Sequence, residues 1–186
     1  RLAPAERQRV AAELGAQIGR LQRLAAGGVA RHEDWLTADM AGALARSSLP
    51  KPLHAEVDAF LAAIGPFERV VVHGDLMFRH VLVDGGRLVG LIDWGDALVT
   101  DRHYELAKLH LDLFDGDRTL LRTCLDAAEW PIRPDFPQRA LAMALYRHAH
   151  GVVQHDSMDV FHKLDALVGE RRVDDLSELA RALFAL

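Results

Sequence analysis

Two aspartates, Asp75 and Asp93, carry the chemistry that this sequence suggests. Each follows a short aliphatic run, and each has a glycine within two residues. Residues 80–92 lie between them and contain the turn Asp84-Gly85-Gly86, which predicts a β-hairpin. Because a hairpin returns the chain to its starting point, we expect the two carboxylates to lie close together. One carboxylate could orient an attacking hydroxyl and the other could hold a metal ion, which are two requirements of phosphoryl transfer.

Each aspartate has an alternative role as a turn residue that bonds its own backbone. The pair, separated by a hairpin, is far more specific than either residue alone. His73 precedes Asp75 by two residues and is expected to hold the turn by hydrogen bonds rather than to act in catalysis. Asp101 precedes a helical pattern and could cap that helix or tie the Asp75 turn down from behind.

The surrounding elements are mostly helical. Apolar periodicity predicts helices over residues 4–27, 37–45, 53–64, 104–113, 119–128, 138–153, 158–168 and 174–186. Short β-branched runs predict strands over residues 69–72, 80–84 and 87–92. Gly15 and Gly19, four residues apart, could mark a close contact between helices. We therefore predict one α+β domain over residues 1–186, mostly α-helical, with one small hairpin sheet.

Composition excludes several classes of function. The 186 residues include 27 acidic and 22 basic residues, and no basic block is long enough to indicate a nucleic-acid surface. No apolar run approaches the roughly 20 residues that cross a bilayer, so no membrane span is expected. Cys124 is the single cysteine and is expected to be a buried thiol. A cytoplasmic location fits these features, and the sequence leaves the oligomeric state open.

The block of motifs resembles the aminoglycoside phosphotransferase family. It comprises His73-Gly74-Asp75-Leu76, the hairpin, residues 91–97 and Asp101 followed by Tyr104-Glu105-Leu106-Ala107. That family includes choline-kinase-like enzymes and shares the protein-kinase fold. The resemblance implies that Asp75 is the catalytic aspartate, that Asp93 binds the metal, and that Asp101 is a structural aspartate. It also implies ATP or another nucleoside triphosphate as donor, Mg²⁺ or Mn²⁺ as cofactor, and a small-molecule hydroxyl as acceptor.

One residue departs from the family pattern. The family has asparagine five positions after the catalytic aspartate, as a metal ligand and a brace of the loop, and this chain has His80 there. Imidazole is a poor ligand for Mg²⁺ but binds Mn²⁺ or Zn²⁺. Three interpretations follow: His80 braces the loop by hydrogen bonds, it ligates a softer metal, or the site is catalytically weakened.

The segment before residue 69 also departs from the family. It has no glycine-rich turn between strands and no lysine within a strand, since Lys51 lies between two prolines. The chain therefore resembles only the C-terminal lobe, without the nucleotide-binding lobe. Two rival functions stay open at this stage. One is a non-catalytic pseudokinase or binding module, and the other is a metal-dependent hydrolase that uses His73, Asp75, His80 and Asp93 as ligands.

Overall fold

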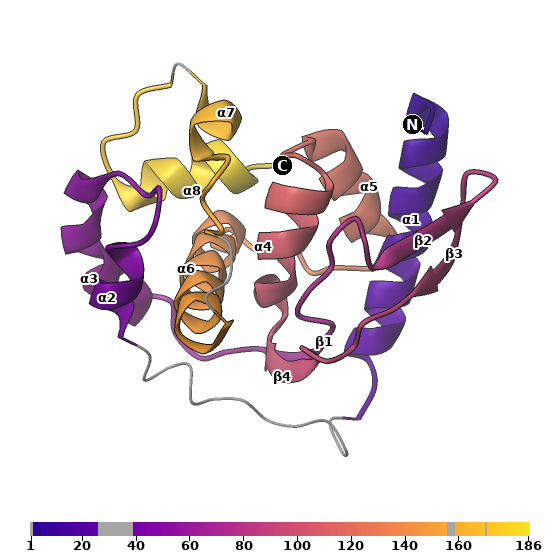
Figure 1. Cartoon of the computed structure of the whole chain (residues 1–186), viewed down its shortest axis with the longest axis horizontal. Coiled ribbons are helices and arrows are strands. Elements are labelled where there is room, and N and C mark those ends of the chain that lie inside the picture. Colours follow the sequence, from indigo (N-terminus) through magenta and orange to yellow (C-terminus); the bar gives the residue numbers. More distant parts are fainter. Residues whose placement is uncertain (1, 26–38, 156–158, 170) are drawn as a thin grey trace.

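The computed structural model describes residues 2–25, 39–155, 159–169 and 171–186 (Figure 1). Helices dominate, and the sheets are small, as predicted. The α-helices are α1 (Pro4–Gln22), α2 (Met40–Leu44), α3 (Val57–Ala62), α4 (Leu106–Lys108), α5 (Arg118–Ala127), α6 (Phe136–His155), α7 (Leu164–Val168) and α8 (Leu176–Phe184). Two 3₁₀ segments, η2 (Lys51–Glu56) and η3 (Arg102–Glu105), and one π segment, η4 (Leu109–Leu113), complete the helical part.

The first helix packs closely against α5, and two glycines make this possible. A Cβ atom at Gly15 would lie 2.0 Å from the backbone oxygen of Cys124, and one at Gly19 would lie 2.6 Å from that of Ala128. The close helix contact expected from the glycine spacing is therefore confirmed. Cys124 is fully buried in this contact, as predicted, and burial raises the pKa of its thiol to about 12.

We predict that Gly15→Ala destabilises the fold by about 1–3 kcal/mol. The added methyl meets backbone atoms of α5, which can give way only if the two helices move apart, and such overpacking outweighs the gain in helix propensity. Urea denaturation of the wild type and of Gly15→Ala measures the change in the free energy of unfolding. Gln8→Ala, on the exposed face of α1, serves as the control and should unfold close to the wild type. Equal midpoints for Gly15→Ala and the control would contradict the close packing.

The strands form two separate pairs rather than one sheet. β1 (Arg69–Val72) pairs antiparallel with β4 (Leu98–Asp101), and β2 (Val81–Asp84) pairs antiparallel with β3 (Arg87–Leu91). The hairpin was predicted, and its turn residues Gly85 and Gly86 both have positive φ. The predicted small hairpin sheet is confirmed, and the structure adds a second pair, since β1 is joined by a short strand, β4, that was not predicted from the sequence.

The hairpin lies beside α1, at the right of Figure 1, and side chains of α1 hold it there. The Glu13 carboxylate accepts a hydrogen bond from the Leu88 amide at 2.8 Å and pairs with Arg87. Since β2 and β3 carry the residues that lead away from Asp75 and back to Asp93, this contact fixes the position of both turns against the helical core.

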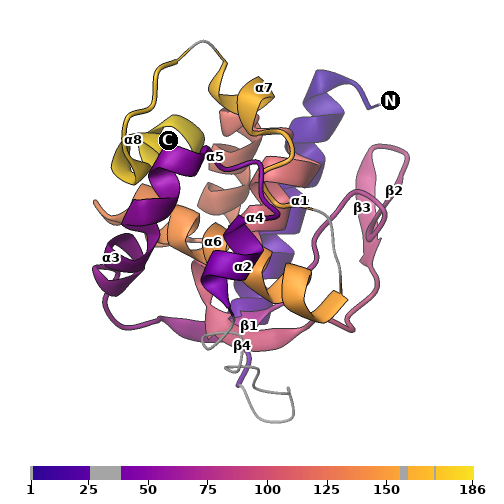
Figure 2. The ribbon, with the colours of Figure 1, turned by 60° about the vertical axis from the view of Figure 1, so that its left-hand side comes forward.

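Helix α6 runs through the middle of the helical part and contacts α2, α4 and α8 (Figures 1 and 2). Its residues 140–145 are completely buried, and buried apolar side chains of α1, α5 and α8 belong to the same core cluster as part of this run. The helix was predicted over residues 138–153, and the structure extends it at both ends. The continuous apolar run in its middle is what a helix surrounded by other helices requires.

Other helices differ from the prediction in their bounds. The segment predicted as one helix over residues 53–64 is split into η2 and α3, and the one over residues 104–113 is split into η3, α4 and η4. Only Leu164–Val168 is helical within the stretch predicted over residues 158–168. The helix predicted to begin at Thr37 is α2, which begins at Met40, and Thr37 lies outside the described residues. Within the described residues, no helix has the length and apolarity to cross a membrane.

Candidate active site

The turn that carries Asp75 follows β1 and depends on Gly74. Gly74 has φ +83°, and a Cβ atom there would lie 2.3 Å from the backbone oxygen of Asp96. Only glycine allows this backbone conformation and this close approach together. The turn after β1 is therefore pressed against the turn after β3, which brings the two predicted aspartates to one place.

His80 lies between the two aspartates. Its Nδ1 is 2.8 Å from the backbone oxygen of Asp75 and 3.4 Å from Asp75 Oδ2, while its Nε2 is 3.3 Å from Asp93 Oδ2. The two carboxylates are thus neighbours, as the hairpin predicted, and one imidazole connects them. The Asp75 side chain is 18% exposed and that of Asp93 is 62% exposed, so both can be reached from outside.

His73 supports the turn and has no free nitrogen. Its Nε2 donates to the backbone oxygen of Ile92 at 3.0 Å, and its Nδ1 accepts from the Asp75 amide at 3.3 Å. Burial lowers the pKa of His73, which favours this neutral form. The ring also packs on Trp94, with centroids 4.5 Å apart. These contacts fit the predicted supporting role, and they leave no lone pair for the hydrolase ligand set. The described residues also contain no cluster of three or more histidine, cysteine or acidic side chains that could hold a metal.

Glu105, which the sequence analysis assigned no role, holds the turn from behind. Its Oε2 accepts from the His73 amide at 2.7 Å, and its Oε1 accepts from the Gly74 amide at 3.2 Å. The side chain is buried, and burial raises the pKa of Glu105 to about 7, although the two amides and Arg147 oppose the shift. The contact between this buried carboxylate and the turn after β1 could not be predicted from the spacing of residues in the sequence.

We predict that Glu105 makes the stability of the fold depend on pH. Because its pKa is higher in the folded state than its usual 4.5, the folded protein holds a proton that the unfolded chain releases. The stability from Glu105 is therefore complete below about pH 4.5 and decreases, by on the order of 3 kcal/mol, as the pH rises to about 7. Urea denaturation of the wild type and Glu105→Gln at pH 5 and pH 8 measures this.

The quantity to compare is the free energy of unfolding of the wild type minus that of the variant, since other titrating groups cancel. We expect this difference to be smaller at pH 8 than at pH 5. Glu129→Gln, at an exposed position, should give a difference that does not change with pH. A constant difference for Glu105→Gln as well would contradict the raised pKa.

Two cations from distant helices lie beside Asp75. Arg147, in the middle of α6, donates to the Gly74 carbonyl at 3.2 Å and lies 3.4 Å from Asp75 Oδ1 and 3.6 Å from Asp96 Oδ2. Lys108, in α4, places its Nζ 3.8 Å from Asp75 Oδ1. Burial, followed by the charge of Arg147, lowers the pKa of Lys108. Arg147 therefore connects both turns of the site to the buried central helix.

Asp101 does not contact the Asp75 turn directly. It is completely buried and accepts hydrogen bonds from the amides of Glu68 and His103, from His103 Nδ1 at 2.7 Å and from Arg139 at 3.2 Å. The expected cap is confirmed, because Asp101 is the N-cap of η3. The expected tie to the turn is made by Glu105 instead. Asp101 supports the Asp75 turn indirectly, because it fixes the end of β4 and the start of η3, and η3 carries Glu105.

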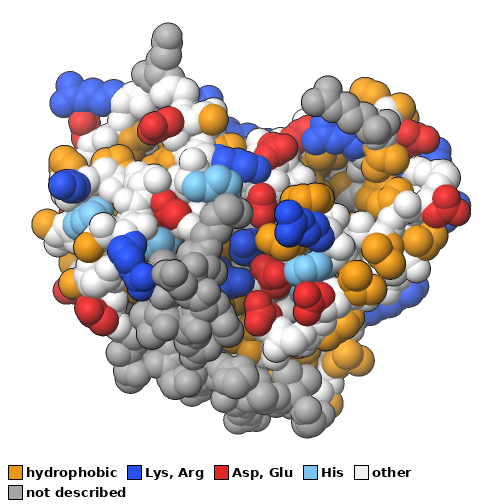
Figure 3. Space-filling view, in the orientation of Figure 1, with side chains coloured by type: hydrophobic (Ala, Val, Ile, Leu, Met, Phe, Trp, Pro, Cys, Tyr) orange, Lys and Arg blue, Asp and Glu red, His pale blue; other side chains and the backbone are white. Residues whose placement is uncertain are grey.

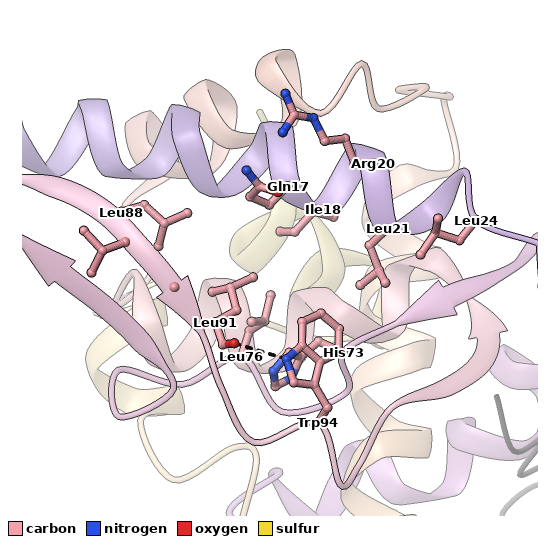
Figure 4. A pocket seen from close by; sticks show the side chains of 12 residues that line it. Gln17, Ile18, Arg20, Leu21, Leu24, His73, Leu76, Leu88, Leu91 and Trp94 are labelled. Atoms are coloured by element: carbon pink, nitrogen blue, oxygen red, sulfur yellow. Dashed lines mark hydrogen bonds between the residues drawn. The ribbon is translucent and has the colours of Figure 1, made fainter. Parts of the chain in front are cut away.

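An apolar recess of about 440 Å³ lies next to the site, between α1 and β3 (Figure 4). Leu21 and Leu24 form one side, Leu88 and Leu91 the other, and the His73 and Trp94 rings, which are tilted against each other, close its end. The Trp94 indole donates to the Leu91 carbonyl at 3.1 Å and remains 44% exposed. None of Asp75, His80 and Asp93 lines the recess. The recess is therefore a surface beside the charged site. On the face of the molecule drawn in Figure 3, charged and histidine side chains gather in the middle and apolar side chains cover the hairpin.

The site joins a strand, a glycine turn, a hairpin and a second acidic turn in the order of the motifs identified in the sequence. A family model described as the phosphotransferase enzyme family matches residues 1–142, which is most of this chain. The chain belongs to the phosphotransferase enzyme family. Among curated relatives of this family member, the hygromycin-B 4-O-kinase of Escherichia coli is 41% identical over 44 residues, covering 24% of this chain and 13% of that enzyme.

Solved structures agree on the fold of this chain. A choline/ethanolamine kinase family protein from Mesorhizobium loti superposes with a TM-score of 0.60 at 20% identity, over 93% of this chain and 65% of that one. The streptomycin–ATP–APH(2")-IIa ternary complex gives a TM-score of 0.58 at 15% identity, with the same two coverages. The predicted kinase-like C-terminal lobe is confirmed at the level of the fold. The chain spans less than two thirds of the length of these solved proteins, 65% of each.

Proposed function

We propose that this chain is the acceptor- and metal-binding part of an ATP-dependent kinase for small molecules. The acceptor would be a hydroxyl group of an aminoglycoside-like compound, an amino alcohol or a sugar. The observation that supports this most directly is the position of His80, whose ring lies within 3.4 Å of both Asp75 and Asp93. Two carboxylates so placed, in a phosphotransferase, are suited to one hydroxyl and one cation.

Asp75 is proposed as the residue that orients the acceptor hydroxyl. Its carboxylate would accept the hydroxyl proton as the hydroxyl oxygen bonds to the γ-phosphorus and the bond from that phosphorus to the bridging oxygen of ADP breaks. His73, Glu105 and Arg147 keep the turn in one position through hydrogen bonds to its backbone. In this scheme most of the catalysis comes from positioning, and Asp75 receives a proton that it later returns to water.

Asp93 and His80 are proposed to hold the divalent cation. Asp93 offers a carboxylate oxygen that is open on its outer side, and His80 offers Nε2 toward the same space. When bound, Mg²⁺ or Mn²⁺ would neutralise charge on the phosphates of ATP. The donor set fits a divalent cation because two hydrogen-bond acceptors face one another there, which is unfavourable without a positive charge between them. Lys108 and Arg147 add fixed positive charge on the Asp75 side.

A direct assay tests the proposed function in the protein that contains this chain. Purified protein is incubated with MgCl₂ or MnCl₂, radiolabelled ATP and one of four acceptors: hygromycin B, streptomycin, choline or glucose. We expect ADP and a phosphorylated acceptor with at least one of them, and a rise in melting temperature on adding Mg-ATP. The four acceptors represent the three proposed classes: aminoglycoside-like compounds, amino alcohols and sugars.

The rival interpretation, a non-catalytic binding module, predicts a different result. Such a protein would produce no ADP with any acceptor or either cation, and Mg-ATP would leave its melting temperature unchanged. That combination would overturn the proposed kinase. A melting shift without phosphoryl transfer to any acceptor class would also overturn it, because the site would then bind the nucleotide without using Asp75.

A further inference from the structure

We propose that His80 is a nitrogen ligand of the bound cation and that the site consequently prefers Mn²⁺ to Mg²⁺. The inference rests on the proposed function in taking Asp93 and His80 as cation ligands. It goes further by deriving the ligating state of His80 and by assigning the class of metal, which is a divalent ion that accepts nitrogen as well as oxygen donors. Three features of the described residues carry it: the tautomer of His80, the atom that faces its free nitrogen, and the composition of the donor set.

The hydrogen bond to Asp75 fixes the tautomer of His80. Nδ1 lies 2.8 Å from the backbone oxygen of Asp75, and a carbonyl oxygen can only accept. Nδ1 must therefore carry the proton. In the neutral ring, Nε2 is then unprotonated and presents its lone pair on the opposite side. This is the arrangement found in metal-binding histidines, in which one nitrogen is fixed by a hydrogen bond to a carbonyl and the other binds the ion.

The lone pair on Nε2 faces a second acceptor. Asp93 Oδ2 lies 3.3 Å away, a distance at which a lone pair and a carboxylate oxygen repel unless a proton or a metal ion lies near both. Two donors bound to one ion at about 2.1 Å and at right angles are about 3 Å apart. The observed separation of Nε2 and Oδ2 is close to that value, so both atoms could bind one cation without a large movement of either turn.

The donor set selects the metal. One imidazole and one carboxylate make a site of mixed nitrogen and oxygen donors, and Mg²⁺ binds imidazole poorly, whereas Mn²⁺ tolerates it. Only two protein atoms are involved, so water and nucleotide phosphate oxygens would fill the other positions. The open side of Asp93, which is 62% exposed, leaves room for them. We therefore expect weak binding by the protein alone and stronger binding together with ADP.

Asparagine at position 80 provides a matched comparison. Its amide N–H₂ could still donate to the Asp75 carbonyl, as Nδ1 of His80 does, while its oxygen would replace Nε2 as the second donor. His80→Asn therefore preserves the brace and changes only the ligating atom. His162→Asn is the control, because His162 is exposed and bonds only to a local carbonyl, Asp159 O, within the described contacts.

The experiment uses Mn²⁺ as the probe and needs no turnover. The full chain is titrated with MnCl₂ in the presence of ADP, and pulsed electron paramagnetic resonance then detects nitrogen coupled to the bound ion. We expect nitrogen coupling in the wild type and in His162→Asn, and its loss in His80→Asn, which still binds Mn²⁺. Uniform ¹⁵N labelling of histidine should change the coupling pattern. Competition with MgCl₂ should show that His80→Asn lowers the preference for Mn²⁺ about tenfold or more.

Two outcomes would overturn the inference. Bound Mn²⁺ without histidine coupling in the wild type would show that a proton, rather than the metal, lies between Nε2 and Asp93. Coupling that persists in His80→Asn would show that another histidine binds the ion. Neither outcome bears on phosphoryl transfer, since the kinase proposal would fail instead if no acceptor were phosphorylated with either cation.

Discussion

We expect Asp75→Asn to lower the proposed rate of phosphoryl transfer by about 10²–10⁴-fold, which is the usual contribution of a positioned general base. Asparagine keeps the size and shape of the side chain but cannot take the hydroxyl proton. The amide also loses the ion pairs with Arg147 and Lys108. The measurement is the initial rate of ADP formation with the best acceptor found for the wild type, at saturating ATP and metal.

Asp84→Asn is the matched control for this loss of activity. Asp84 is an exposed carboxylate at the hairpin turn, nine residues from Asp75, and its substitution should leave the rate unchanged. Circular dichroism should show that Asp75→Asn retains the wild-type helix content. A rate within threefold of the wild type would show that Asp75 is not the base, and the proposed mechanism would then be wrong even if the protein is a kinase.

We expect Asp101→Ala to lower the free energy of unfolding by about 3–5 kcal/mol, the usual cost of removing one partner from a buried ion pair. The change removes the acceptor for two amides, for His103 Nδ1 and for Arg139, and both His103 and Arg139 are buried. Chemical denaturation at neutral pH measures the loss. Asp84→Ala, at the exposed turn, should change stability by less than about 0.5 kcal/mol.

The contribution of Asp101 to the stability of the fold also depends on pH. Burial alone would raise the pKa of Asp101, but the bonds and charge of His103 and the two amides outweigh it and hold the pKa below its usual 3.8. A carboxyl with a lowered pKa stabilises the fold above about pH 3.8, and that stability is lost as the pH falls through the folded-state pKa. The difference in stability between the wild type and Asp101→Ala should therefore shrink between pH 5 and pH 3. A difference that grows in acid would contradict this account.

The predictions from sequence were best where the chain folds on itself locally. The run of β-branched residues, the glycine at position 74 and the turn at Asp84 are separated by few residues, and their spacing was enough to place Asp75 and Asp93 together. The close contact of α1 followed from two glycines four residues apart.

Contacts from distant segments were not predictable in the same way. Glu105 and Arg147 reach the Asp75 turn from 30 and 72 positions along the chain, and no periodicity links them to it. Strand β4 was not predicted because its four residues are too few to show an alternating pattern, and because all four are buried, so that no alternation exists. The pairing of β1 with β4 follows from the tertiary fold, which places the two turns of the site on adjacent strands.

Asp93 has a backbone conformation that favours glycine. Its φ is +62°, in the left-handed region, where an aspartate costs on the order of 1 kcal/mol relative to glycine. The residue that the proposed chemistry needs is thus not the one that the backbone prefers. Evolution or design that selects for thermal stability alone would favour glycine at this position, and selection for function would oppose it. The turn after β3 is therefore a point where stability and activity are in conflict.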